Sequence, residues 1–229
     1  MRMLVPGFGG LMRAQGVLIG LIVLLVALFL AQSLGPAGWE RPFMATPAAV
    51  IESWHRLADG AAGAGDWRQF STLLSCAFLH GDVFHLAGNI LYLWGFGALV
   101  SELLGWRWML GVFLLTALGA SVTHVAMHPA DWTPMLGASG AVMGFMGAYL
   151  GLAVRWELPD PHVWPMARPV PPSHLAILAV VFVALDYQAI FGGSLEMIAF
   201  GAHAGGFTTG LLLTAVVTPM PRSARPRRR

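Results

Sequence analysis

The chain has 229 residues, of which 57% are hydrophobic and only 10% are charged. Charged residues make up about 25% of an ordinary soluble domain, so this composition excludes a soluble globular protein and indicates an integral membrane protein. The net charge is only +2, and the single cysteine, Cys76, excludes an internal disulfide and a sulfur-ligated metal cluster.

The apolar residues form six segments that are predicted to be membrane spans, because a helix needs about 20 residues to cross the hydrocarbon core. In chain order these segments are residues 16–34, 79–104, 108–127, 135–154, 174–191 and 197–217. The predicted fold class is an all-α membrane protein, a six-transmembrane-helix bundle with a long first extracytoplasmic loop. The expected organisation is a cytoplasmic N-terminus at 1–15, one six-span domain at 16–217 that includes loop 1 at 35–78, and a basic cytoplasmic tail at 218–229.

Loop 1, the first long break between spans, begins with a stretch that holds three prolines and a run of small residues at 60–65. It is predicted to contain amphipathic pieces, such as 48–57, that lie on the membrane surface without crossing it. Trp39, Trp54 and Trp67 suit that interfacial depth, since tryptophan is enriched where the bilayer meets water.

The arginines predict how the bundle is oriented. Six spans place both termini on one side, and with the termini inside most arginines are cytoplasmic, including five in the last eight residues. Only Arg41, Arg56 and Arg68 then lie outside, which favours an N-in/C-in topology. The absence of a cleavable or transit-like leader favours the bacterial inner membrane. A basic cluster beside a span more often marks the cytoplasmic end than a nucleic-acid site, so the lipid bilayer, and no nucleic acid, is expected as a partner of the protein.

Unusual polar residues lie near the predicted outer ends of the second, fourth and sixth spans. His85 and Asn89 are about six to ten residues into the second span. Ser139 is about four residues into the fourth span, and His203 is about six into the sixth. These offsets place all of them roughly 6 to 15 Å below the outer surface. Ionisable and polar groups at such depth face the bundle interior or a water-filled cavity.

Of the polar residues at this depth, Ser139 is the one whose role most needs an explanation. It lies between Gly137 and Gly140, and small residues of this kind are also typical of packed transmembrane helices, so the stretch alone leaves packing and catalysis open. A serine hydroxyl becomes a nucleophile when a base removes its proton, and a neutral imidazole is the usual base. We predict Ser139 as the nucleophile and His203 as the general base and later the general acid.

The glycines around His203 favour close helix contact. His203, Gly206 and Gly210 recur on one helical face, and Gly140 belongs to a matching glycine surface on the fourth span. We expect these two helices to pack closely enough to bring the hydroxyl of Ser139 within reach of the imidazole. The alternative at this segment is a helix-packing motif that contains a satisfied histidine.

His85 and Asn89 are predicted to bind the oxyanion that an attacking serine creates. They lie four residues apart and therefore on one face of a helix, and both side chains can donate hydrogen bonds. Together with the backbone N–H of Ser139 they would form an oxyanion hole.

A metal site built from His80, His85 and His203 is the rival interpretation. The sequence has no H-E-x-x-H pattern and no carboxylate in the same layer, so neither a metal nor a cofactor is predicted. The simplest arrangement is a dyad without an orienting carboxylate. Asp186 in the fifth predicted span is left open as a third member.

These motifs resemble those of the rhomboid intramembrane serine proteases. The similar stretches are Phe78-Leu79-His80-Gly81 with His85 and Asn89, then Gly137-Ala138-Ser139-Gly140-Ala141, then Ala202-His203 with Gly205-Gly206-Phe207 and Gly210. They occur in the family's order, and the resemblance covers about residues 67–217. It implies a rhomboid-like bundle that cleaves transmembrane protein substrates without a cofactor. It also implies that Ser139 and His203 are catalytic and that His85 and Asn89 form the oxyanion site.

Two positions depart from the family's pattern. Met143 stands where many relatives carry an aromatic ring against the catalytic histidine, and Ser101 stands where a glutamate is expected, with Glu102 following. The alternative function is a catalytically inactive rhomboid-like protein that binds transmembrane segments for quality control, although such a protein would not need the dyad. A small-solute transporter is disfavoured, since the sequence has no inverted repeat. The oligomeric state is left open.

Overall fold

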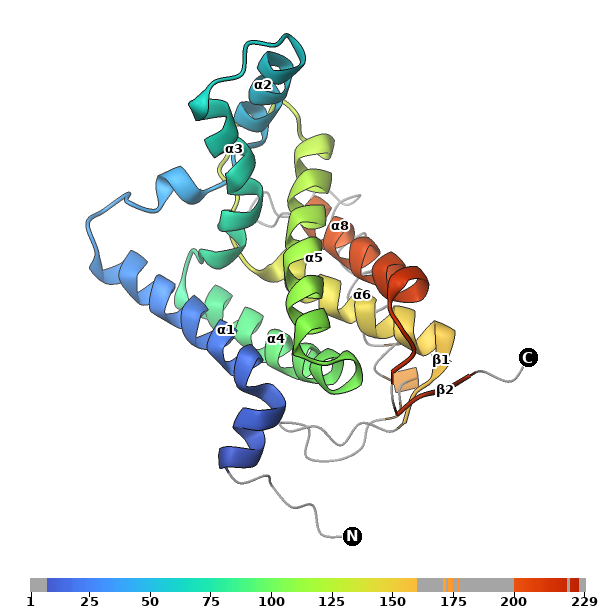
Figure 1. Ribbon diagram of the computed structural model, residues 1–229. Helices are drawn as coiled ribbons and strands as arrows, with labels where there is room; N and C mark the ends of the chain where they lie inside the picture. The colour runs from blue at the N-terminus through green and yellow to red at the C-terminus, as the bar shows by residue number, and fades with distance from the viewer. Residues whose placement is uncertain are drawn as a thin grey trace.

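The computed structural model is helical over most of its described residues, which are 8–159, 171, 173–174, 177, 200–221 and 223–226, with side chains described from residue 15 onward. The helices in chain order are α1 (Phe8–Leu34), η1 (Arg41–Phe43), α2 (Pro47–Ala58), α3 (Ala64–Ser75), η2 (Cys76–Phe78), α4 (Val83–Leu104), α5 (Trp106–Met127), α6 (Ser139–Arg155), α8 (Phe200–Leu212) and η3 (Leu213–Val217). Two short strands, β1 (Trp156–Glu157) and β2 (Arg225–Pro226), pair antiparallel. The all-α class predicted from the sequence is confirmed (Figure 1).

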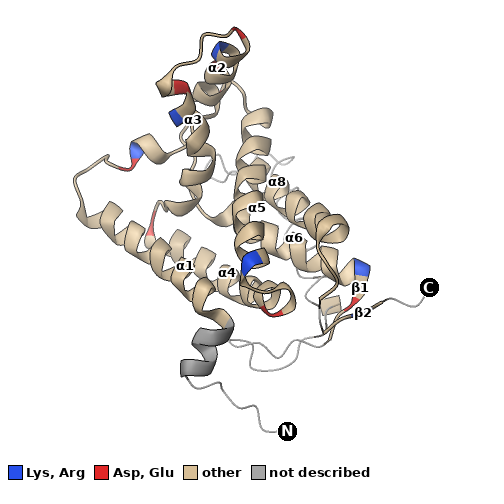
Figure 2. Ribbon diagram, viewed as in Figure 1, with Lys and Arg blue, Asp and Glu red and all other residues tan. Residues whose placement is uncertain are grey.

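Three of the described helices contain segments long and apolar enough to cross a membrane, namely Gln15–Leu34 in α1, Val83–Leu104 and Trp106–Met127. They coincide with the first three predicted spans, while α6 and α8 coincide with the fourth and sixth. The fifth predicted span, 174–191, lies almost entirely outside the described residues. Figure 2 shows most charged residues near the two ends of the bundle and a largely uncharged middle, as a bilayer requires.

Loop 1 folds into α2 and α3 at one end of the bundle (Figure 1). α2 covers the amphipathic piece predicted at 48–57, and Pro47 stands in its first turn, where a missing N–H does no harm. The sequence pattern does not predict α3, because the small residues before it are typical of a loop.

A salt bridge between Arg56 and Asp66 joins α2 to α3. Nε of Arg56 donates a hydrogen bond to Oδ1 of Asp66 at 2.6 Å, and Oδ2 of Asp66 accepts one from the N–H of Gly63 at 2.9 Å. Asp66 is buried, and these two bonds lower the pKa of its carboxyl to about 2. The position of α3 therefore depends on a partner ten residues away, which a local pattern does not reveal.

α6 packs against α8 and α5 through glycines, so that helix backbones touch. A Cβ atom placed at Gly206 would overlap the carbonyl oxygen of Gly140, and one at Gly210 would overlap that of Gly144. On another face of α6, a Cβ at Gly144 would overlap the side chain of Thr116 in α5. The close packing that the glycine pattern predicts for the fourth and sixth spans is present.

α6 begins inside the bundle. Its first residue is Ser139, four residues after the predicted start of the fourth span at 135. A Cβ at Gly140 would overlap Ala120 of α5, which lies about two turns before the end of that helix at Met127. Two turns correspond to about 10 Å along the helix axis. The segment before α6 therefore descends beside α5 before the helix starts, as Figure 1 shows.

Loop 1 holds this descending segment in place. Ala45 and Met135 exchange two backbone hydrogen bonds, of 3.2 and 2.7 Å. The N–H of Gly137 donates to the carbonyl oxygen of Cys76 at 2.9 Å. Non-helical backbone at membrane depth needs such partners, because lipid supplies none.

The described part of the basic tail is attached to the end of α6. The β1–β2 register aligns Glu157 with Arg225. Nη1 of Arg155, the last residue of α6, donates a hydrogen bond to the carbonyl oxygen of Thr218 at 2.9 Å. The tail thus returns to the end of the bundle opposite α2 and α3 (Figure 1).

Candidate active site

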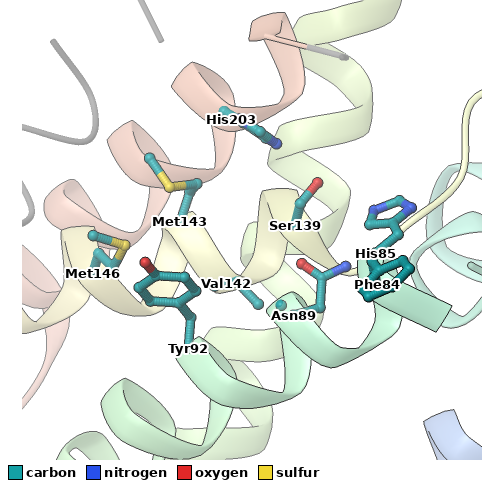
Figure 3. A pocket seen from close by; sticks show the side chains of 10 residues that line it. Phe84, His85, Asn89, Tyr92, Ser139, Val142, Met143, Met146 and His203 are labelled. Carbon is teal, nitrogen blue, oxygen red and sulfur yellow. The ribbon is translucent and has the colours of Figure 1, made fainter. Parts of the chain in front are cut away.

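A cavity of about 280 Å³ lies between α4, α6 and α8 (Figure 3). The four polar residues that the sequence predicts as site residues all line it, namely Ser139, His203, His85 and Asn89. The remaining lining residues are mostly apolar, namely Phe84, Gly88, Tyr92, Val142, Met143 and Met146. Helices that are far apart in the sequence therefore bring these polar groups to one place.

Gly137 shapes the surroundings of Ser139, the first residue of α6. Its φ is 125°, a conformation that favours glycine. A Cβ atom placed there would also lie 2.7 Å from Nε2 of His85 and 3.8 Å from Oγ of Ser139. Gly137 therefore allows the ring of His85 to lie close to the serine. The first N–H groups of a helix such as α6 have no partner within the helix and favour negative charge.

His203 lies in the first turns of α8, and glycines on both sides of it press that helix against α5. A Cβ at Gly201 would approach His124 within 3.3 Å, and one at Gly205 would overlap Thr123. In Figure 3 the imidazole of His203 and the hydroxyl of Ser139 point toward one another. Asp186, the third member that the sequence leaves open, lies outside the described residues.

His85 and Asn89 project from successive turns at the start of α4 (Figure 3). Asp82 caps this helix, and its Oδ1 accepts hydrogen bonds from the N–H of His85 at 2.9 Å and of Phe84 at 2.8 Å. These two hydrogen bonds, chiefly the one from the N–H of His85, lower the pKa of the Asp82 carboxyl. Nδ2 of Asn89 is buried and has no hydrogen-bond partner among the described residues. An unpaired buried donor is unusual, and this one can bind an acceptor that enters the cavity.

Met143 forms the wall of the cavity beside His203, at the position where the resemblance leads one to expect an aromatic ring (Figure 3). It is buried, with 7% of its surface exposed. A thioether can pack against an imidazole, but its side chain has more rotatable bonds than an aromatic ring and constrains the histidine less.

His80 is a buried neighbour of the site, which the sequence analysis considers as a metal ligand and as part of the first family motif. Its ring contacts that of His85 edge to face, with centroids 5.3 Å apart and an interplanar angle of 72°. Within the described parts of the chain, no group of three or more His, Cys, Asp or Glu side chains is placed to hold a metal ion. The two histidines are five residues apart, so this contact joins the link before α4 to the first turn of that helix.

The fold and the cavity define an all-α integral membrane protein in which a serine and a histidine face each other inside the helix bundle. A family model described as Rhomboid domain matches residues 67–220, which is more than half of the chain. This chain belongs to the rhomboid family. The rhomboid-like fold inferred from the motifs is confirmed by that match.

Named relatives come from plants, yeast and bacteria. RHOMBOID-like protein 1 of Arabidopsis thaliana is 29% identical over 157 residues, which are 68% of this chain and 36% of the relative. Rhomboid protein 1, mitochondrial, of Saccharomyces cerevisiae is 29% identical over 163 residues, 69% of this chain and 44% of the relative. Rhomboid protease GluP of Bacillus subtilis is 38% identical over 91 residues, 39% of this chain and 17% of the relative. The chain thus spans less than half the length of each of these relatives.

Proposed function

We propose that this protein is an intramembrane serine endopeptidase that hydrolyses peptide bonds in or near the transmembrane segments of other membrane proteins. The observation that carries the proposal is that Ser139 and His203 point toward one another in a cavity inside the bundle (Figure 3). Membership of the rhomboid family supports it, since one similar bacterial protein is named a rhomboid protease.

In the proposed reaction His203 accepts the proton of Ser139 while Oγ attacks the carbonyl carbon of the scissile bond. The tetrahedral intermediate collapses as the C–N bond breaks, and the protonated imidazole gives its proton to the leaving amine. An acyl ester on Ser139 remains. A water molecule then attacks this ester while His203 takes its proton. The bond between the acyl carbon and Oγ breaks as His203 gives that proton to Oγ, which releases the carboxylic acid product and restores the serine. The reaction requires no cofactor.

The tetrahedral intermediate carries a negative charge on the former carbonyl oxygen, and this charge needs hydrogen-bond donors. We propose that Asn89 supplies Nδ2, which has no partner among the described residues, and that His85 and the backbone N–H of Ser139 supply the others. One donor of this kind is commonly worth about 2.7 to 4 kcal/mol of the activation barrier. Such a donor has no hydrogen bond to another described residue to give up when the charge develops.

The proposed substrates are transmembrane segments, because the cavity opens among helices that lie at membrane depth. A peptide bond in such a segment is shielded by the hydrogen bonds of its own helix. The substrate has to unwind locally before its carbonyl carbon can approach Ser139. We therefore expect substrates with helix-weakening residues near the scissile bond to be cleaved faster.

We also propose the N-in/C-in topology. The α2–α3 pair lies at the opposite end of the bundle from the α4–α5 turn and from β1 and β2, where Arg107 and Arg155 are found (Figure 1). Arg41, Arg56 and Arg68 belong to loop 1 on the opposite side, so the proposal depends on the excess of arginines in the whole sequence, which favours the cytoplasmic side for the termini. The bacterial inner membrane stays a prediction of the sequence, because the similar proteins include mitochondrial and chloroplastic ones.

The proposal is tested by labelling the purified protein with a fluorophosphonate probe and by measuring cleavage of a transmembrane test substrate. We expect the probe to attach to Ser139, and we expect Ser139→Ala and His203→Ala to reduce both labelling and cleavage to undetectable levels. The reason is that the nucleophile and its base act as one unit, so the loss of either removes the covalent step.

Two exposed residues of the same types serve as controls. Ser33 is exposed at the end of α1, where its hydroxyl bonds only to the carbonyl oxygen of Phe29 in the described structure, and His55 is exposed on α2. Ser33→Ala and His55→Ala should behave like the wild type. Cleavage that survives in Ser139→Ala would refute the assignment. A wild type that binds transmembrane segments but is neither labelled nor able to cleave them would support the inactive alternative.

A further inference from the structure

A side chain of α1 holds the backbone next to the candidate site. Oε1 of Gln32 accepts a hydrogen bond from the N–H of His80 at 3.1 Å, and Nε2 of Gln32 donates one to the carbonyl oxygen of His80 at 3.3 Å. His80 lies in the short non-helical link between η2 and α4. Backbone groups in such a link lack helical partners, and lipid cannot replace them. One amide side chain thus satisfies both backbone groups of His80.

The side chain of His80 extends this contact to the site. The residue is only 1% exposed, and its ring lies edge to face against that of His85, with centroids 5.3 Å apart. Neither ring nitrogen of His80 has a hydrogen-bond partner among the described residues, and the contact with His85 is made by the ring. Gly137 lies on another side of His85, close to Nε2. The ring of His85 therefore contacts the ring of His80 and also lies close to the segment that carries Ser139.

We propose that Gln32 and His80 are positioning residues for the oxyanion site. Gln32 holds the backbone of His80, and the ring of His80 sets the orientation of His85. The inference rests on the proposed function. Helix α1 precedes residues 67–220, which match the family model. Through Gln32, this helix would nevertheless influence the geometry of the site. The effect can be large, because a misplacement of about 1 Å in a catalytic arrangement can lower the rate about a hundredfold.

The chain contains a matched control for a purely structural effect. Gln15, near the other end of α1, accepts a hydrogen bond at Oε1 from Nε1 of Trp94 in α4 at 3.1 Å. Both glutamines therefore join α1 by hydrogen bonds either to α4 itself or to the link just before it. Gln15 and Gln32 are about 25 Å apart along the helix, so only Gln32 is close to the candidate site.

The experiment compares Gln32→Leu with Gln15→Leu in the purified protein in lipid nanodiscs. The measurements are the unfolding temperature, the rate at which a fluorophosphonate labels Ser139, and kcat and KM for a transmembrane test substrate. We expect both variants to unfold at a lower temperature. Only Gln32→Leu should lower kcat and the labelling rate, by about tenfold to a hundredfold, with KM nearly unchanged. Equal losses of kcat in the two variants, or a wild-type kcat in Gln32→Leu, would overturn the inference.

A second pair of variants separates the ring of His80 from its nitrogens. His80→Phe keeps a planar ring against His85, and we expect its kcat to stay close to that of the wild type. His80→Ala removes the ring and should lose kcat as Gln32→Leu does. The double variant should lose little more than either single one, because both changes act through His85. A Phe variant as slow as the Ala variant would contradict positioning by ring packing.

Failure of this inference can be told apart from failure of the proposed function. A wild type that is not labelled at Ser139, or a Ser139→Ala variant that still cleaves, makes the proposed function wrong and the inference with it. A wild type that is labelled and cleaves, with Gln32→Leu indistinguishable from Gln15→Leu, makes only the positioning role wrong.

Discussion

The interface between α6 and α8 is built differently from the one between α1 and α4. At the first, the carbonyl oxygen of Gly140 occupies the space where a Cβ of Gly206 would lie, so backbone meets backbone. At the second, a side chain fills the gap, and Cδ1 of the fully buried Leu18 lies 3.0 Å from where a Cβ of Gly97 would be. Backbones in contact allow little relative movement, whereas a leucine can change rotamer to absorb a small shift.

This difference agrees with the roles proposed for the two pairs of helices. In the proposed reaction Ser139 and His203 exchange a proton, which requires hydrogen-bond distance, and they lie on the glycine-packed pair. His85 and Asn89 lie on α4, whose contact with α1 depends on side chains. A helix held in that way is freer to shift slightly relative to its neighbour. The bonds from Gln32 to His80 reduce that freedom at the end of α4 nearest the site.

The strongest test of this difference between the two interfaces places a methyl group between α6 and α8. In Gly206→Ala the new Cβ would overlap the carbonyl oxygen of Gly140, so α6 and α8 must separate. We expect labelling of Ser139 to disappear and the unfolding temperature to fall. Gly95→Ala in α4 is the matched control, because a Cβ there meets nothing within 4 Å. Alanine favours a helix over glycine by about 1 kcal/mol, so this control should be as stable as the wild type. A Gly206→Ala variant that is labelled normally would show that the site does not depend on the backbone contact between α6 and α8.

A milder test removes packing from the interface between α1 and α4. Leu18→Ala leaves a cavity in the core, and we expect it to lower the free energy of unfolding by about 2 kcal/mol. The rate of labelling at Ser139 should stay unchanged, since Leu18 lies toward the end of α1 remote from Gln32. The matched control is Leu24→Ala, whose side chain is 45% exposed on the same helix. If Leu18→Ala were to abolish labelling as Gly206→Ala is expected to do, the two interfaces would not differ in the way proposed.

The smallest effect is expected where charge holds two helices together, between α2 and α3. The pKa of Asp66 is lowered from 3.8 to about 2, mainly by Arg56 and the N–H of Gly63. The charged carboxylate therefore stabilises the folded state fully above about pH 4, and this contribution is lost as the pH falls toward about 2. Asp66→Asn should unfold at a lower temperature than the wild type at neutral pH. That difference should shrink as the pH is lowered through this range.

The control for this prediction is Glu52→Gln. The Glu52 carboxylate lies 3.7 Å from the guanidinium of Arg56, but both side chains are about half exposed. An exposed pair of this kind contributes little, so we expect no pH-dependent change in the unfolding temperature. A difference between Asp66→Asn and the wild type that stayed constant from neutral pH to about pH 2 would contradict the role of the ion pair.

The helices show which features a sequence pattern can predict. The long apolar segments and the spacing of Gly206 and Gly210 are properties of single helices. The described structure has three helices long enough to span a membrane at the first three predicted positions, and it has the predicted glycine packing. α3 does not follow from its own residues, since it is joined to α2 through Arg56 and Asp66. The start of α6 is likewise misplaced by the pattern, because the apolar residues from 135 onward continue without a break into the helix.

By itself, the sequence determined that this protein lies in a membrane, which apolar segments of the described chain form long helices, and which of these helices carry serine, histidine and asparagine. Hydropathy and glycine spacing are local, so they can be recognised in one segment at a time. Only the tertiary structure decided that α6 begins at Ser139 within the bundle, that loop 1 bonds to the segment before it, and that Gln32 meets His80. These hydrogen bonds have a backbone N–H or C=O group on at least one side, and because nearly every residue possesses such groups, the order of side chains does not reveal which of them meet.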